Sequence, residues 1–158
     1  MRFSKCMILG TVMNSQNVLI RRFKPEDYDR IISLWSSVNL PVRPKGRDSY
    51  EKIRAQIRSG SSILLVAELN GKIVGTVLGT HDSRKAWINR LAVDTEFRRK
   101  NIAKKLVSEA EKWFGERGLE VFACVIENDN ITSMELFKKL GYEEWDVRYF
   151  SKRKSQES

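Results

Sequence analysis

The stretch from Trp87 to Gly115 constrains the fold most, because it joins a strand to a long helix through a short basic turn. Residues 87–93 are largely apolar, with β-branched and aromatic side chains, which is typical of a strand. Residues 102–115 repeat apolar side chains at helical spacing. Between the two blocks the chain reads Arg98-Arg99-Lys100-Asn101-Ile102-Ala103. We therefore predict that this basic segment is a strand-to-helix turn that becomes a helix N-terminus.

A helix N-terminus of this composition favours an anion. The first helical turn presents N–H groups that have no partner within the helix, and the macrodipole places partial positive charge there. The basic side chains of Arg98, Arg99 and Lys100 add to that field, so the segment predicts a phosphate or pyrophosphate site. The alternative is a solvated turn, which is the commoner role of such a basic run.

The spacing Arg98-x-x-Asn101-x-Ala103 resembles the Gln/Arg-x-x-Gly-x-Gly/Ala signature of the GNAT family of N-acetyltransferases. In that family the loop holds the pyrophosphate of acetyl-coenzyme A with backbone amides. The loop needs a small last residue and a fourth residue that tolerates positive φ. Ala103 meets the first need, and Asn101 departs from the usual glycine but is the next most tolerant residue type.

Two further motifs extend the resemblance over roughly residues 18–150. The strand end Leu91-Ala92-Val93-Asp94 resembles the fourth strand of the family, and the block from Asn130 to Tyr142 resembles its Asn-x-x-Ala-x-x-Leu-Tyr-x-x-x-Gly-Phe block. The Arg43-Pro44 pair further resembles a little-characterised prokaryotic branch. The resemblance implies an α/β GNAT fold, a mixed twisted sheet of about six or seven strands with helices on both faces.

The resemblance also implies where acetyl-coenzyme A binds. In the family the fourth and fifth strands splay apart, and the pantetheine arm lies in the gap like an added strand, which leaves backbone groups for its amides. The implied cofactor-binding residues are Leu91, Ala92, Val93, Arg98, Arg99, Lys100, Asn101, Ile102, Ala103 and Asn130.

The groups that move protons are less determined. By period two, Asn89 lies on the same face as Leu91 and Val93, where it can hold a water that relays the proton of the acceptor. A hydrogen-bonded sheet residue is the alternative reading of Asn89. Glu127 is a second candidate base, since Val125 stands where some relatives carry a glutamate on the fifth strand.

The general acid of many relatives is a tyrosine, and Phe137 stands at its position. Tyr142 and Tyr149 are substitutes only if the fold brings them near, and Tyr142 is expected in the core. Cys124 is expected to pack as an apolar residue instead of carrying an acetyl group. His81 lies in a polar turn and is expected to be exposed.

Periodicity and turn signals indicate one domain. We expect a poorly determined leader over residues 1–16, an acetyltransferase domain over 17–150 and a disordered charged tail over 151–158. Asn70-Gly71 predicts a hairpin turn. The expected strands are 18–23, 62–69, 72–80, 87–93, 119–126 (buried on both faces) and 144–150, and the expected helices are 24–38, 48–60, 102–115 and 131–140.

The net charge of +9 attracts polyanions. Coenzyme A fits that field, whereas nucleic acid is disfavoured as a partner because Lys and Arg are spread over the whole chain. The other alternative is a catalytically degenerate relative that binds coenzyme A without turnover. Two cysteines, no Cys/His cluster and no run of about 20 apolar residues predict a cytoplasmic protein with no metal and no membrane partner. The sequence leaves the oligomeric state open, with a homodimer as one possibility.

The loop over residues 39–47 carries Arg43, Lys45 and Arg47, with Pro41 and Pro44 restricting its backbone. In the family this region borders the acceptor side of the cleft. Basic side chains there favour an amine that also bears a carboxylate or phosphate. The alternative is that these charges are only solvated.

Overall fold

The computed structural model describes residues 18–155; the expected leader, residues 1–16, and residues 156–158 of the expected tail lie outside the described residues. The strands are β1 (Leu19–Arg22), β2 (Ser62–Leu69), β3 (Lys72–His81), β4 (Ala86–Val93) and β5 (Phe122–Cys124). The α-helices are α1 (Tyr28–Ser37), α2 (Tyr50–Arg58), α3 (Ile102–Gly115) and α4 (Ile131–Lys139), with short 3-10 helices η2 (Pro25–Asp27) and η3 (Thr95–Phe97).

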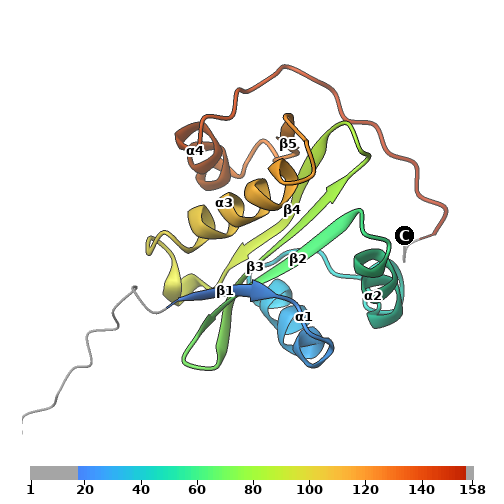
Figure 1. Cartoon of the computed structure of the whole chain (residues 1–158), viewed down its shortest axis with the longest axis vertical. Coiled ribbons are helices and arrows are strands. Elements are labelled where there is room, and N and C mark those ends of the chain that lie inside the picture. Colours follow the sequence, from blue (N-terminus) through green and yellow to red (C-terminus); the bar gives the residue numbers. More distant parts are fainter. Residues whose placement is uncertain (1–17, 156–158) are drawn as a thin grey trace, which may run out of the picture.

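The strands form one mixed sheet in the order β1-β2-β3-β4-β5, in which β1 to β4 are antiparallel and β5 is parallel to β4 (Figure 1). The predicted hairpin between β2 and β3 is confirmed, since Asn70 and Gly71 both take positive φ, at 51° and 78°. Within residues 18–155 the sheet has five strands, which corrects the expected six or seven.

Helices cover both faces of the sheet. We call the face that packs against α3 the α3 face and the opposite one, against α1 and α2, the α1 face. Glycines on β3 let α3 approach closely, because a Cβ on Gly79 would lie 2.6 Å from Phe114 Cζ and one on Gly75 would lie 3.1 Å from Leu106 Cδ1. The close packing fixes the position of α3. It therefore also fixes the N-terminus of α3, where the sequence predicts an anion site.

The C-terminal third departs from the expected strands. The run 119–126 yields only the three residues of β5, and they are half-buried instead of buried on both faces. Residues 144–150 form no strand, and Trp145 is 74% exposed. An alternating apolar pattern makes a strand only where a sheet edge pairs with it, and within the described chain no strand lies on the free side of β5. Residues 151–155 carry no helix or strand.

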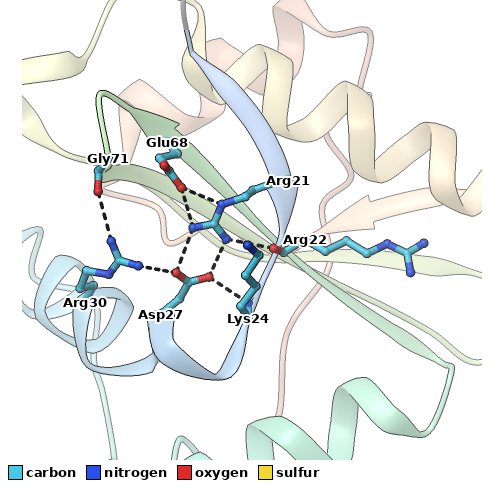
Figure 2. A network of polar contacts seen from close by, with 7 residues as sticks. All are labelled: Arg21, Arg22, Lys24, Asp27, Arg30, Glu68 and Gly71. Carbon is cyan, nitrogen blue, oxygen red and sulfur yellow. Dashed lines mark hydrogen bonds and ion pairs between the residues drawn. The ribbon is translucent and has the colours of Figure 1, made fainter.

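A charged network ties β1, η2 and β2 together at the start of the domain (Figure 2). The carboxylate of Asp27 has no exposed surface and receives Arg21 Nη1 at 2.6 Å, Arg30 Nη2 at 2.7 Å and the backbone N–H of Lys24 at 2.8 Å. Arg21 Nε also donates to Glu68 Oε2 at 2.7 Å. Every oxygen of this buried carboxylate therefore has a donor, which is the condition under which burying the charge is tolerated.

We predict that Asp27→Asn lowers the free energy of unfolding by about 3 kcal/mol, because removing one partner of a buried ion pair leaves the other uncompensated. The hydrogen bond from Arg21 holds the pKa of Asp27 below its usual range. Its contribution is therefore complete above the unfolded pKa of about 3.9 and is lost as the pH falls through the lower folded value.

Denaturant titrations at pH 7 and along an acid series test this prediction. The matched control is Asp29→Asn, an exposed acid in the first turn of α1, for which we expect less than about 1 kcal/mol. Equal effects of the two substitutions would contradict a special role for the buried carboxylate.

Candidate functional site

The sheet opens between β4 and β5. Their pairing is limited to Ala86 with Phe122, Trp87 with Ala123 and Ile88 with Cys124, yet β4 continues to Val93. Residues 89–93 therefore have no strand neighbour on that side within residues 18–155. This is the splay that the resemblance implied, and it leaves a peptide-like edge for a ligand to pair with.

A β-bulge sits in β4 at the start of the opening. Asn89 pairs with Leu78 and Ala92 pairs with Thr76, so Arg90 and Leu91 together face the single residue Val77. Arg90 takes the left-handed backbone, with φ 49°. The extra residue shifts the alternation of side chains along the strand by one.

The bulge corrects the predicted orientation of Asn89. Leu91 and Val93 pack toward the α3 face, whereas Asn89 pairs with Leu78 of the α1 face. Counting by two failed because the count crossed the inserted residue. Asn89 is exposed, and its Nδ2 donates to Thr80 Oγ1 at 3.2 Å.

The turn into α3 has the backbone that the sequence predicted. Arg99 and Asn101 are both left-handed, with φ 61° and 59°, so the prediction of positive φ at Asn101 is confirmed. The Asn101 side chain makes no capping hydrogen bond, and the helix begins with the bond from Lys105 N–H to Asn101 O at 3.0 Å. The N–H groups of residues 102–104 precede that bond and have no acceptor inside the helix. A helix end of this kind can bind an anion.

Side chains around this turn divide into packing and charged groups. Ile102 is buried in the core, so only its backbone faces the turn, and the half-buried Ala103 adds no bulk beyond a methyl group. Arg98 and Arg99 are exposed, and Lys100 Nζ lies 5.0 Å above the ring of Phe97. These positions suit a phosphate held by backbone N–H groups and screened by cations.

The turn and the open strand edge are in direct contact. Arg98 Nε donates to the carbonyl of Val93 at 3.3 Å. Across the opening, Asn130 caps α4 by accepting the N–H of Ser133 at 3.1 Å, and its own N–H donates to the carbonyl of Glu127 at 2.9 Å. The structure thus groups the predicted residues into two sets, one on β4 and α3 and one in the β5–α4 loop, where Glu127 is exposed.

The aromatic candidates for the general acid are poorly placed to give a proton. Phe137 lies in the core and packs edge-on against Tyr142, with ring centroids 4.9 Å apart. Burial raises the pKa of Tyr142, whose hydroxyl donates to Glu111 Oε1 at 2.7 Å. Tyr142 therefore belongs to the packing of α3 on α4, as the sequence predicted. Tyr149 lies on the exposed C-terminal segment.

His81 is not the exposed turn residue that was expected. It is half-buried against α3, with its ring 5.7 Å from that of Trp113. Its Nδ1 accepts the N–H of Ser83 at 3.1 Å, and its buried Nε2 has no hydrogen-bond partner among the described residues. It packs as part of the end of β3.

Sequence reasoning missed the pair that joins the opening to the acceptor-side loop. Arg90 Nη2 lies 2.7 Å from Asp48 Oδ1 and 2.9 Å from Oδ2, with the two side chains 12% and 8% exposed. Burial lowers the pKa of Arg90, and the neighbouring carboxylate of Asp48 offsets only part of this shift. The available signal was an arginine inside the largely apolar run of β4, because a buried arginine requires a partner.

Comparison with known proteins fits this geometry. A sequence profile described as "Acetyltransferase (GNAT) family" matches residues 28–142, which is more than half of the chain. The chain belongs to the GNAT acetyltransferase family. The profile spans the open β4 edge, the basic turn and the α4 block, so it covers each motif on which the resemblance was based.

Solved structures of other acetyltransferases share the GNAT fold of this chain. The aminoglycoside N-acetyltransferase AAC(6')-Iy, solved with a bisubstrate analogue of coenzyme A, is 19% identical with a TM-score of 0.74, covering 87% of this chain and 99% of that one. Glucosamine-6-phosphate N-acetyltransferase from Arabidopsis thaliana is 21% identical with a TM-score of 0.73, covering 89% and 100%. PaiA N-acetyltransferase from Thermoplasma acidophilum, in complex with coenzyme A, is 21% identical with a TM-score of 0.73, covering 84% and 93%.

No group of three or more His, Cys, Asp or Glu side chains in residues 18–155 is arranged to hold a metal ion. None of the helices in the same range is long and apolar enough to cross a membrane.

We predict that Ala103→Glu lowers the affinity for coenzyme A roughly a hundredfold, or about 2.8 kcal/mol, because it places a carboxylate beside the N–H groups of the first turn. The helix should persist, since glutamate and alanine have similar helix propensity. Calorimetric titration with coenzyme A measures the loss. Ser108→Glu, at an exposed position of the same helix, is the control, and equal losses in both variants would show only a change in net charge.

Burial raises the pKa of the Cys124 thiol to about 11. We therefore predict that iodoacetamide alkylates Cys124 at pH 8 roughly two orders of magnitude more slowly than free cysteine, with a rate that climbs until the pH reaches that value. A Cys6→Ser background leaves Cys124 as the single thiol. Rapid alkylation at pH 7 would indicate a thiolate and would reopen the possibility that Cys124 carries an acetyl group.

Proposed function

We propose that this protein transfers an acetyl group from acetyl-coenzyme A to an amine by direct attack of the amine on the thioester. One observation carries the proposal: the free N–H groups at the start of α3 lie beside an unpaired strand edge, and Arg98 joins the two through the carbonyl of Val93. An anion-binding end that continues into a peptide-like edge matches a pyrophosphate that continues into the amides of pantetheine. Family members solved with coenzyme A or its analogue support the same ligand.

The roles of the residues follow from their chemistry. The backbone N–H groups of residues 102–104 hold the pyrophosphate, and Arg98, Arg99 and Lys100 neutralise its charge. The backbone of Leu91 to Val93 pairs with the pantetheine amides, and an N–H near Ala92 or Val93 polarises the thioester carbonyl. Ala103 and the left-handed Asn101 keep the loop free of bulk where phosphates approach.

Proton removal from the amine is assigned to Asn89 or Glu127. Asn89 is exposed on the α1 face beside Thr80, where its amide can orient a water that takes the proton. Glu127 lies in the loop after β5 and is the carboxylate of the predicted set. An Asn89→Ala variant that keeps its affinity for coenzyme A but loses turnover would support the first role, and Glu127→Gln tests the second in the same way.

The charge of the acceptor-side loop favours an amine that also carries an anionic group. Arg43, Lys45 and Arg47 place three cations on residues 39–47, and the one adjacent carboxylate, Asp48, pairs chiefly with Arg90 and lies 3.6 Å from Arg47 Nε. Two of the structurally similar proteins illustrate two classes of acceptor. One is a glucosamine-6-phosphate N-acetyltransferase, and another is an aminoglycoside N-acetyltransferase. A phosphorylated amino sugar fits the basic loop, whereas a polycationic aminoglycoside is repelled by it.

We also propose a cellular location and an oligomeric state. A cytoplasmic location suits a chain with two cysteines and a coenzyme A substrate. A homodimer is supported by the exposed apolar side chains of the C-terminal segment, Trp145, Val147, Tyr149 and Phe150. A coenzyme A binder without turnover is the second candidate function, because Phe137 removes the usual acid.

Ligand-dependent melting tests the cofactor. Acetyl-coenzyme A at 100 times its dissociation constant should stabilise the protein by about 2.7 kcal/mol and raise its melting temperature by a few degrees. Ala103→Glu should lose that response, while Ser108→Glu should keep it. An unchanged melting temperature at millimolar ligand would contradict the assignment.

An acceptor screen tests the reaction. We expect glucosamine 6-phosphate or a similar anionic amine to release free coenzyme A faster than any aminoglycoside does. Arg43→Ala should raise the Michaelis constant for that acceptor and leave the constant for acetyl-coenzyme A nearly unchanged. The substitution removes the hydrogen bond from Arg43 Nη1 to the carbonyl of Val42, at 3.1 Å, but keeps the bond from the backbone N–H of Arg43 to Asp48 Oδ2, at 2.8 Å. A preference for purely cationic amines would overturn the acceptor class, and no turnover at all would favour the degenerate binder.

A further inference from the structure

The ion pair between Arg90 and Asp48 links parts of the chain that are 42 residues apart. Arg90 lies at the bulge of β4, and Asp48 lies at the end of the acceptor-side loop, just before α2. Besides its two contacts with the carboxylate, Arg90 donates from Nη1 to the carbonyl of Pro41 at 2.5 Å. One guanidinium therefore holds both ends of the loop to the strand.

Asp48 in turn organises the loop from within. Its Oδ2 accepts the N–H of Arg43 at 2.8 Å, its own N–H donates to the carbonyl of Arg43 at 3.0 Å, and its carbonyl accepts the hydroxyl of Tyr28 at 2.9 Å. The Nε of Arg47 lies 3.6 Å from the same carboxylate. The loop conformation thus depends on a carboxylate whose charge is balanced chiefly by Arg90.

A second path returns from Arg90 to the core. Its backbone carbonyl accepts Thr76 Oγ1 at 3.1 Å, and Thr76 Oγ1 accepts the indole N–H of Trp35 at 2.8 Å. The guanidinium carbon of Arg90 lies 4.9 Å from the centroid of the Trp35 ring. The side chain of Arg90 therefore contacts Trp35 directly, and its backbone carbonyl is linked to Trp35 through Thr76. Trp35 and Thr76 are buried. This closed circuit holds the left-handed backbone of Arg90 in place.

We propose that Arg90 is a positioning residue that sets the acceptor-side loop against the open edge of β4. The inference rests on the proposed function, because the strand residues after Arg90 are those assigned to the thioester. If one side chain fixes both the loop and the bulge, the amine and the polarised carbonyl are aligned by the same contact. Lysine cannot replace it, since a single ammonium does not span the carboxylate, the Pro41 carbonyl and the Trp35 ring together.

We expect substitutions of this ion pair to affect the kinetics of the acceptor but not the binding of coenzyme A. With glucosamine 6-phosphate as acceptor, Arg90→Lys should raise the acceptor Michaelis constant and lower kcat, each at least about tenfold, and leave the dissociation constant of coenzyme A within about twofold. Asp48→Asn should do the same while keeping Arg90, and the double variant should be no worse than either single one. Arg84→Lys, an exposed arginine in the β3–β4 turn, is the control and should change neither constant.

Hydrogen–deuterium exchange of the full chain gives a readout that needs no turnover. The N–H groups of Arg43 and Asp48 should exchange at least about tenfold faster in Arg90→Lys and in Asp48→Asn, while those of α3 keep wild-type protection. If Arg90→Lys does not fold, Asp48→Asn decides the question.

Three results would overturn the proposal. These are wild-type exchange in the loop of both variants, an acceptor constant that does not move, or equal loss of affinity for coenzyme A and acceptor, which would mean general unfolding. A wild type that acetylates no amine would instead defeat the proposed function and with it the alignment of substrates. Exchange would still show whether Arg90 holds the loop.

Discussion

The bulge at Arg90 is the local constraint on which the rest of the site depends. It inserts one residue into β4 just where pairing with β5 ends at Ile88 and Cys124. The inserted residue turns Leu91 and Val93 toward the α3 face and leaves Asn89 on the α1 face. At its open end the strand therefore presents side chains to both faces of the sheet, with the edge that we propose for the cofactor on one side and Asn89, proposed for the acceptor, on the α1 face. Buried partners on α1 and β3 hold the left-handed backbone that this arrangement requires.

Backbone groups supply most of the chemistry assigned to this protein. The N–H groups at the start of α3 and the edge of β4 need no particular side chain beyond the absence of bulk at Ala103 and the left-handed backbone at Asn101. The chain shares the fold of similar solved structures to which it is 17–24% identical. Proton transfer, in contrast, needs a side chain, and with Phe137 in the core we propose Asn89 or Glu127 for it.

The sequence predicted what depends on local backbone preference and missed what depends on distant contacts. The helix N-terminus, the positive φ of Asn101 and the Asn70-Gly71 turn follow from residue type and short spacing, and all three are found in the structure. The face of Asn89 was wrong because a bulge carries no reliable sequence signal and breaks the period of two. The strand at 144–150 was wrong because an alternating pattern does not supply an edge to pair with. The Arg90–Asp48 pair was missed because its partners are 42 residues apart.

We propose that backbone N–H groups at the start of α3 and on the edge of β4 hold the cofactor. Backbone amide NMR during titration with coenzyme A tests it most directly, because each N–H reports its own hydrogen bonding. We predict that the largest shifts fall on residues 102–104 and 91–93, with smaller ones on Arg98, Arg99 and Lys100. Shifts confined to surface lysines and arginines elsewhere, or no saturable shift at millimolar ligand, would contradict it.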